Sequence, residues 1–452
     1  MRLSTSVIFY VVQLFSAISN RGMLKVCVVY SFKPSAWVSC QKIVTNLLKA
    51  YELNQDQLEL TLVDFSNRIT DYDFVASGTK LVNAKPDVVL FLDHQPHPVY
   101  FLSWVMREFR EIDHTPAFVF HLYGDFSLTF KEWVALEPLI EKANVLWYAA
   151  SERQKAMLTE FIPEEQLHVC PFPVDPKEFR WNGKRDEAFR KEMGWKDDET
   201  VFIFTGRLSR QKRIHQLLST FAEWRRETQA NARIVFVGDP DKVGEPWLGK
   251  PEYDSEYFHD LMEIMDEMSE DDRAHVHFTG FRPNKELPRF YHAADCLVNI
   301  SVHNDEDYGM TCAEAQASGL PLILTDWAGF HGFQRPGLEN EVQLVPVRID
   351  PKGKLINLKA LKRAFSHMHE NHKSFNREKI ARTSLEWTSV ANVANIVSRN
   401  PTRFKVFSKF LPLMHHAGHR EYYTKHNTFS DFKKKSFNDL YMKVYRHYVR
   451  PS

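Results

Sequence analysis

The chain has 452 residues, more than the roughly 250–300 at which a single hydrophobic core stops growing, so we expect two domains. Hydrophobic residues make up 44% and charged residues 26%, which is ordinary for a folded globular protein and excludes disordered, collagen-like and multi-span membrane classes. The 58 Lys and Arg residues balance the 58 Asp and Glu residues, so net charge gives no indication of nucleic-acid binding.

Residues 1–22 allow two interpretations. Val7 to Phe15 is apolar, follows Arg2 and precedes small residues, which is the pattern of a signal peptide or short anchor. Alternatively these residues are a dispensable upstream start, with Met23 as the working initiator ahead of an apolar strand. The five cysteines are widely spaced and form no Cys-x-x-Cys pair, which favours a reducing compartment.

Short apolar, β-branched runs then alternate with helical patterns along the chain. The predicted strands form two series: Val26–Tyr30, Leu60–Val63, Val88–Leu92, Ala117–His121 and Val145–Ala149, then Val201–Thr205, Ile234–Val237, Val276–Thr279, Cys296–Ile300, Leu322–Thr325 and Gln343–Val345. Continuous apolar strands with intervening helices indicate parallel sheets covered on both faces. Two series predict two Rossmann-like domains facing a cleft, with ligands beyond the carboxyl ends of the strands.

The break between the two series lies near residues 175–200. Asp175 to Asp186 lacks an apolar period and is dense in charged and turn-forming residues, which predicts a linker followed by a charged helix. We therefore expect a first domain over residues 23–177 and a second over 178–385. Residues 386–400 and 401–452 follow these domains.

Two acidic residues stand out after a strand of the second series. Glu306 precedes Gly309, and a helix is predicted to start near Met310, with Thr311 in its first turn and Glu314 about one turn further. The N–H groups of such a helix start attract phosphate or sugar oxygens, and a carboxylate can accept hydrogen bonds from sugar hydroxyls. Acidic residues are common at helix starts, however, so the pair taken alone is better explained as solvated carboxylates.

Two cations follow the first strand of the second series. Gly206 and Arg207 come directly after that strand, and Lys212 lies five residues beyond Arg207. An Arg fork and a Lys point charge suit the two phosphates of a diphosphate. Surface cations at a helix start are the alternative, but the helix dipole disfavours them there unless an anion is bound.

Together these motifs resemble glycosyltransferase family 4, whose members are retaining transferases with the GT-B fold. The resemblance runs in order through most of residues 23–400. It is carried by Gly206-Arg207 with Lys212, Val237-Gly238-Asp239, Thr279-Gly280-Phe281, Glu306-x₇-Glu314 and Ala317-Ser-Gly-Leu-Pro321, supported by Ser151-Glu152, by Pro171 to Asp175 with Phe179, and by Trp387 with Val390.

The resemblance implies a nucleotide-diphosphate sugar, UDP- or GDP-linked, as co-substrate, without a further cofactor. Arg207 and Lys212 would neutralise the leaving diphosphate, Glu306 would hold the donor sugar and Glu314 the ribose. Gly206, Asp239, Gly309, Met310 and Thr311 would complete the donor site. His121, which ends a strand, resembles the histidine that the family places near the transferred sugar; without the family, a core histidine is the simpler interpretation. The family's last helix, here residues 386–400, returns to the first domain.

The sequence departs from the family at three places. Phe172-Pro173 replaces Asn-Gly in the turn between the domains, and Arg213 stands where a glycine is usual. Ser31 to Trp37 replaces a Gly-Gly turn after the first strand, so Lys33 or Trp37 is a candidate substitute on the acceptor side. Asp93, His94 and His97 follow another strand end and are weaker candidates for the same cleft.

No essential metal is predicted. Asp239-Pro-Asp241 and Asp71-Tyr-Asp73 resemble a metal-binding Asp-x-Asp pair, but the first falls in a strand-end turn that the family shares. Two alternative functions stay open. One is an epimerase or phosphorylase with the same fold, and the other is a non-catalytic subunit that binds nucleotide sugars.

The last 52 residues are basic and aromatic. They hold eleven Lys and Arg against three Asp and Glu, a net charge of +8 that leaves −8 on the first 400 residues. Two interpretations explain this basic, aromatic composition about equally well. In one, the segment docks to an anionic membrane near a lipid-linked acceptor. In the other, it is an extension that packs on the acidic body of the protein. Because nucleotide sugars are made inside the cell, we expect a cytoplasmic protein. For the same reason we favour the interpretation of residues 1–22 as an upstream start.

Overall fold

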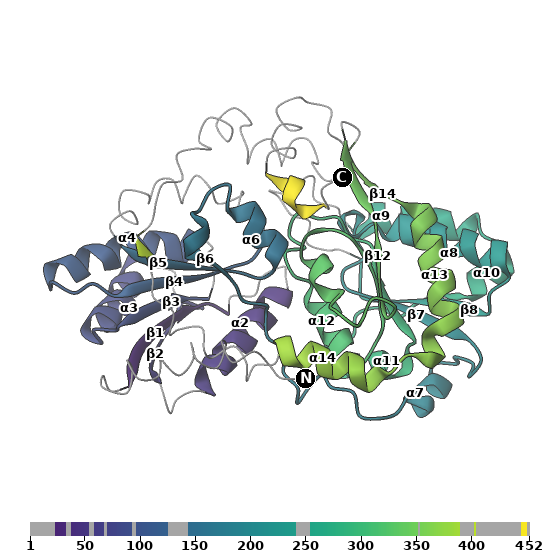
Figure 1. The fold of residues 1–452 in the computed structure, drawn as a ribbon, viewed down its shortest axis with the longest axis horizontal. Coiled ribbons are helices and arrows are strands. Elements are labelled where there is room, and N and C mark those ends of the chain that lie inside the picture. Colours follow the sequence, from purple (N-terminus) through teal and green to yellow (C-terminus); the bar gives the residue numbers. More distant parts are fainter. Residues whose placement is uncertain are drawn as a thin grey trace.

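The computed structural model describes residues 23–32, 38–53, 58–66, 70–92, 96–124, 143–240, 254–350, 353–388, 402–403 and 444–449. Within them, two large sheets lie side by side, each with helices on both faces (Figure 1). The predicted α/β architecture with two sheets is therefore confirmed.

The first sheet contains seven strands in the order β15-β5-β4-β3-β1-β2, with β6 also paired to β5. All pairs are parallel except β15 with β5. Its strands are β1 (Leu24–Tyr30), β2 (Leu58–Asp64), β3 (Val88–Phe91), β4 (Ala117–Leu122), β5 (Asn144–Ala149), β6 (Leu167–Val169) and β15 (Thr402–Arg403). The helices around it are α2 (Val38–Glu52), α3 (Asp71–Asn83), α4 (Pro96–Glu111), α6 (Glu152–Leu158) and the 3₁₀ turn η2 (Glu164–Gln166).

The second sheet contains six parallel strands in the order β12-β11-β10-β7-β8-β9. They are β7 (Thr200–Thr205), β8 (Ala232–Val237), β9 (Val276–Phe278), β10 (Cys296–Asn299), β11 (Leu322–Thr325) and β12 (Val342–Val345). Its α-helices are α7 (Glu187–Glu192), α8 (Ile214–Thr228), α9 (Asp254–Asp266), α10 (Glu270–Ala274), α11 (Leu287–Ala293), α12 (Met310–Ala317), α13 (Leu358–Asn371) and α14 (Arg377–Thr388). The 3₁₀ turns are η3 (Arg210–Lys212), η4 (Asn284–Glu286), η5 (Ala328–Phe333) and η6 (His372–Ser374), and β13 (Val347–Asp350) pairs with β14 (Gly353–Ile356) as a hairpin.

Aromatic packing fixes the helices on the central strand β7. Phe202 lies 5.8 Å from Trp224 of α8 and 5.0 Å from Phe365 of α13, measured between ring centroids. All three side chains are at most 2% exposed. Large buried rings contribute most to a core because the hydrophobic free energy scales with the apolar area removed from water.

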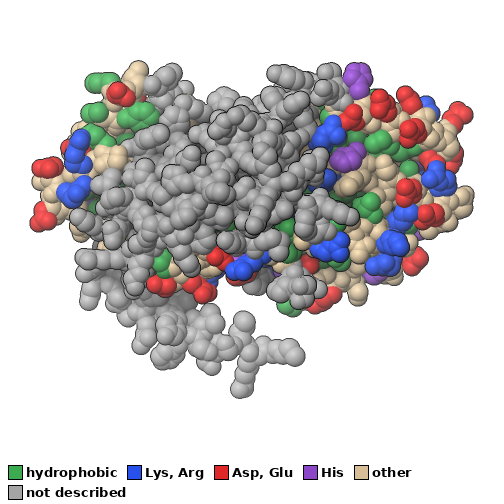
Figure 2. Space-filling model, turned by 90° about the horizontal axis from the view of Figure 1, so that it is seen from above, with side chains coloured by type: hydrophobic (Ala, Val, Ile, Leu, Met, Phe, Trp, Pro, Cys, Tyr) green, Lys and Arg blue, Asp and Glu red, His purple; other side chains and the backbone are tan. Residues whose placement is uncertain are grey.

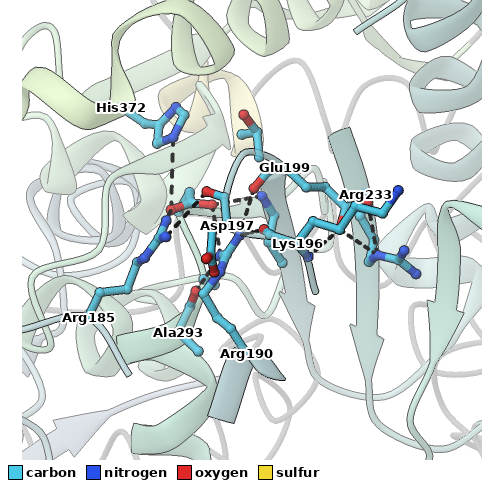
Figure 3. A network of polar contacts seen from close by, with 12 residues as sticks. Arg185, Arg190, Lys196, Asp197, Glu199, Arg233, Ala293 and His372 are labelled. Atoms are coloured by element: carbon cyan, nitrogen blue, oxygen red, sulfur yellow. Dashed lines mark hydrogen bonds and ion pairs between the residues drawn. The ribbon is translucent and has the colours of Figure 1, made fainter. Parts of the chain in front are cut away.

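A buried polar network holds the amino ends of β7 and β10 together (Figure 3). Asp295 accepts hydrogen bonds from Val201 N at 2.8 Å and from Arg190 at 3.1 Å, and Arg185 contributes another at 3.3 Å. The Arg190 guanidinium, which is fully buried on α7, also donates to the carbonyls of residues 196, 199 and 293. The charged helix predicted after the linker, α7, is thus anchored at the amino ends of β7 and β10. The candidate site lies at the carboxyl ends of these two strands.

The chain returns to the first domain after the second. Thr402 and Arg403 form β15 on β5, and the 3₁₀ turn η9 (Tyr445–Tyr448) packs against α6 and η5. Residues 389–401 and most of the basic extension lie outside the described residues, so the predicted return helix and tail stay predictions. On the face drawn in Figure 2, acidic and basic side chains are interspersed over the described surface of the second domain.

Candidate functional site

The loops after β7 and β10 meet at the carboxyl edge of the second sheet. β7 leads to β8 and β9 on one side, whereas β10 leads to β11 and β12 on the other. This reversal of strand order is where open α/β sheets bind ligands, because neighbouring connections diverge and leave a crevice. The predicted cation pair follows β7 and the predicted acid pair follows β10.

The turn after β7 depends on two close-packed glycines. Gly206 has φ +143° and donates its N–H to Val237 O at 3.0 Å. A Cβ atom on Gly238 would lie 1.9 Å from Gly206 O, which no side chain tolerates. The two strand-end turns are therefore in direct backbone contact, and this contact fixes where half-buried Arg207 leaves the sheet.

Lys212 ends η3, and Arg213 then joins η3 to α8 with φ 58° and ψ 32°. This left-handed conformation favours glycine, because a Cβ atom crowds the following carbonyl. The left-handed backbone at Arg213 explains why a glycine is usual at this position in the family that the sequence resembles.

Lys212 and Glu306 lie in direct contact. Lys212 Nζ forms an ion pair with Glu306 Oε1, joining residues 94 positions apart in the sequence. Glu306 is 5% exposed, and its carbonyl accepts a hydrogen bond from Gly329 N at 2.8 Å. The structure thus brings together one predicted cation and one predicted acid.

Helix α12 begins at Met310, as predicted. Gly309 precedes it with φ +111°, and the described residues provide no side-chain cap for its first turn. Met310 is buried and Thr311 is half-buried. The first-turn N–H groups of such a helix carry partial positive charge, which suits an anion.

Glu314 is 4% exposed on the second turn of α12. Burial raises the pKa of its carboxyl to about 8. The positive charge of Lys42 lowers this pKa and the negative charge of Glu178 raises it, each by less than burial does. Lys42 belongs to α2 of the first domain, and its side chain pairs with Glu178 of the linker. Sequence reasoning missed Lys42, because nothing in its local pattern indicates that α2 approaches α12.

His121 is fully buried at the end of β4. Its Nε2 atom lies 2.7 Å from the Tyr51 hydroxyl, and among the described residues its Nδ1 atom has no hydrogen-bond partner. Burial lowers the pKa of the imidazole to about 3, so the ring is neutral at physiological pH. Contact with a sugar stays a prediction.

Asp239 links the ends of two strands. Its carboxylate accepts a hydrogen bond from Phe281 N at 2.8 Å, and its carbonyl accepts one from Leu208 N at 2.9 Å. It therefore shapes the edge beside Arg207, and direct donor binding by Asp239 stays a prediction. At the other Asp-x-Asp pair, Asp73 and Thr70 form a capping box at the start of α3.

Several weaker candidates lie outside the described residues, namely Lys33, Trp37, Asp93, His94 and Asp241. His97 lies in the first turn of α4, but its side chain is outside the described part of the structure. Among the described residues there is no group of three or more His, Cys, Asp or Glu side chains that could hold a metal ion. In the same part of the chain, no helix has the length and apolarity needed to cross a bilayer.

Two further residues near the acid loop were not predicted. Asp307 follows Glu306 and bonds to the first domain. Lys354 of β14 is 4% exposed, lies 3.3 Å from Asn304 Oδ1 and sits 5.3 Å from the Trp327 ring centroid. The run of three acids from Asp305 to Asp307 could have pointed to Asp307, because adjacent carboxylates must find separate partners. Nothing in the sequence of the hairpin that carries Lys354 indicates that this lysine lies near the acids.

The profile of the family described as "Glycosyl transferases group 1" matches residues 185–337. An uncharacterized glycosyltransferase of Methanocaldococcus jannaschii is 29% identical over 212 residues, covering 46% of this chain and 48% of that protein. The lipopolysaccharide 1,2-N-acetylglucosaminetransferase of Salmonella typhimurium is 23% identical over 287 residues, covering 63% and 67%. The match thus spans about half the length of the first of these relatives.

The fold is also found in solved structures. The crystal structure of Anabaena Alr3699/HepE in complex with UDP superposes with a TM-score of 0.62 at 15% identity, covering 83% of this chain and 98% of that chain. Identity this low supports the fold alone, and that fold spans both sheets. Residues 185–337 of this chain thus match the glycosyl transferases group 1 family, and the chain as a whole has the two-domain GT-B fold.

Proposed function

We propose that the protein is a retaining glycosyltransferase that moves a sugar from a nucleotide-diphosphate sugar to an acceptor hydroxyl. The observation that carries the proposal is the Lys212–Glu306 contact at the strand-order reversal between β7 and β10. A buried acid opposite a cation, next to an uncapped helix start and a second buried acid, offers separate partners for a diphosphate, a sugar and a ribose.

Donor binding exchanges the partners of the ion pair. The diphosphate takes Lys212 and Arg207 as its counter-charges, and Glu306 is released to accept hydrogen bonds from hydroxyls of the donor sugar. Glu314 accepts hydrogen bonds from the ribose. UDP is the first nucleotide to test, because the Anabaena structure holds UDP; a GDP-linked donor is the alternative.

The reaction forms a bond between the acceptor oxygen and the anomeric carbon while the bond from that carbon to the diphosphate oxygen breaks. The departing phosphate oxygen takes the acceptor proton on the face of attack, which retains the anomeric configuration. Arg207 and Lys212 stabilise the negative charge that develops on the diphosphate, a role that requires charges held in place before the reaction. Since two cations supply this charge, we propose that turnover does not require a metal ion.

The acceptor is proposed to be a carbohydrate or a lipid-linked carbohydrate, in keeping with the lipopolysaccharide named for the Salmonella relative. We further propose a cytoplasmic location with peripheral contact to the inner membrane through residues 401–452, whose net charge is +8. Co-sedimentation with vesicles of 30% phosphatidylserine tests this at about physiological salt, where basic segments gain about 1 kcal/mol per cation. A variant lacking residues 404–443 is expected to remain in the supernatant, and equal sedimentation of both proteins would contradict membrane contact.

A thermal-shift screen of nucleotides and nucleotide sugars tests the function. A ligand that binds only the native state at 100 times its Kd stabilises the protein by about 2.7 kcal/mol. We expect a diphosphate nucleotide to raise Tm, and the corresponding sugar donor to release that diphosphate when an acceptor is supplied. Absence of any shift across all nucleotides would contradict the proposal.

A further inference from the structure

The third acid of the loop after β10 joins the two domains. Asp307 Oδ2 accepts a hydrogen bond from Gly124 N at 2.9 Å and another from Gln154 Nε2 at 3.1 Å. Both donors belong to the first domain, Gly124 two residues after β4 and Gln154 on α6. The carboxyl of Asp307 is 5% exposed, so these two donors meet it away from bulk water.

The donors are themselves held in place. The Gln154 amide oxygen accepts a hydrogen bond from Ala150 N at 2.6 Å, which turns the Nε2 atom toward Asp307. Gly124 has φ +76°, a conformation that favours glycine, with its N–H directed at the same carboxyl oxygen. The Asp307 contact is therefore made to a prepared first-domain surface.

An aromatic series runs beside this polar contact. The ring of Phe172, in the turn that leads to the linker, lies 5.6 Å from Tyr123 near β4 and 5.5 Å from Tyr308 of the second domain, both in edge-to-face geometry. All three side chains are at most 4% exposed. Tyr123 precedes Gly124 and Tyr308 follows Asp307, so polar and aromatic contacts join the same two loops. The departure of Phe172 from the family pattern thus has a structural explanation.

These contacts lie between the two halves of the proposed active site. Glu306, the proposed sugar-binding acid, is the residue before Asp307, whereas Gly124 lies two residues after β4 in the first domain, the proposed acceptor half. A shift of one loop relative to the other would change the distance between donor and acceptor directly. Misplacement of reacting groups by about 1 Å can lower a rate about 10²-fold.

We propose that Asp307 is a positioning residue, which with Phe172 sets the separation of the donor and acceptor halves of the cleft. This inference rests on the proposed function for its role in catalysis, but the interdomain contact can be tested without any activity. Burial is the largest of the causes that raise the pKa of the Asp307 carboxyl well above its ordinary range. Asparagine is the closest mimic of this group, because it has nearly the same shape and its amide oxygen can accept both hydrogen bonds.

The first experiment measures hydrogen exchange of the peptide that contains Gly124, by mass spectrometry on the intact chain without ligand. Asp307→Ala is expected to speed exchange of the Gly124 amide about 10-fold, because its buried acceptor is lost. Asp307→Asn is expected to keep the wild-type rate, since its amide oxygen can accept the same bonds. Asp271→Ala, which removes an acid 74% exposed on the same domain, is the matched control and should leave the rate unchanged.

The second experiment compares UDP affinity with the rate of sugar transfer. Asp307→Ala is expected to lower kcat about 10²-fold and to leave the Kd for UDP within about twofold, with Asp307→Asn restoring kcat. If Asp307→Ala does not fold, Phe172→Leu replaces it and is expected to lower kcat about 10-fold with UDP affinity again unchanged.

The outcomes separate the inference from the proposed function. Wild-type exchange at Gly124 in Asp307→Ala, or faster exchange with unchanged kcat, overturns the positioning role. If the wild-type protein neither binds a nucleotide nor transfers sugar, the proposed function fails. The interdomain contact is then judged by hydrogen exchange alone. Faster exchange of the Gly124 amide in Asp307→Ala, with a wild-type rate in Asp307→Asn, supports the contact. Equal rates in Asp307→Ala and the wild type overturn it.

Discussion

Replacing Glu314 with glutamine is expected to stabilise the protein while weakening its binding of UDP. The carboxyl is 4% exposed on the second turn of α12. Burial raises its pKa from 4.5 to about 8. Glutamine has nearly the same shape and carries no charge, so it avoids the cost of burying a carboxylate.

The sign of the effect follows from proton binding. Between pH 4.5 and 8 the folded protein keeps a proton that the unfolded chain has released, so the wild-type stability falls as pH rises through this window. At 1.36 kcal/mol per pKa unit, the loss is about 3 kcal/mol at pH 7 and about 5 kcal/mol above pH 8. The stability advantage of Glu314→Gln should therefore be small near pH 5 and should grow until about pH 8.

Urea unfolding at pH 5, 7 and 8.5 measures this difference, with Glu263→Gln on the exposed surface of α9 as the control. The control should differ from wild type by no more than about 0.5 kcal/mol at every pH. In parallel, titration calorimetry is expected to show UDP affinity at least about 10-fold lower in Glu314→Gln, because the proposed ribose contact is weakened. A stability difference that does not change with pH would refute the reasoning about the buried carboxyl.

The remaining predictions concern the cations, the loop and the buried network. Arg207→Ala and Lys212→Ala should each lower transfer about 10²-fold or more with unchanged far-UV circular dichroism, and unchanged turnover in both would contradict their role. Transfer should persist in excess chelator, whereas dependence on an added divalent metal would count against the mechanism. Gly329→Ala should destabilise the protein by about 1–3 kcal/mol in urea unfolding, because its Cβ would lie 2.1 Å from Asp307 O; a stability equal to wild type would show that the loop yields easily. Asp295→Ala should cost about 3–5 kcal/mol by leaving the fully buried Arg190 without its acidic partner, and a loss below about 1 kcal/mol would show that the network of Figure 3 is dispensable.

The central strands of both sheets could be predicted because burial on two faces leaves an unbroken apolar run. Ala117–His121 was predicted and β4 spans Ala117–Leu122, and Leu322–Thr325 was predicted and is β11. The strands β6, β13, β14 and β15 were missed. They are short and lie at an edge or in a separate hairpin, where the pattern is weak.

The candidate site divides in the same way. Local spacing predicted the cations after β7 and the acids around α12, and strand order then explains why Lys212 meets Glu306. Contacts between the domains were beyond local patterns, because Asp307 and Gly124 are 183 residues apart. His121 shows the converse limit, since a polar residue at a strand end proved to be fully buried.

The most direct test of the central claim is a crystal structure of the protein with an intact UDP-sugar or GDP-sugar. The diphosphate is predicted to lie within hydrogen-bond distance of Arg207 and Lys212, with Lys212 separated from Glu306 and the Glu306 carboxylate turned to the sugar. A donor bound elsewhere, or bound between the domains while the Lys212–Glu306 ion pair persists, would contradict the account.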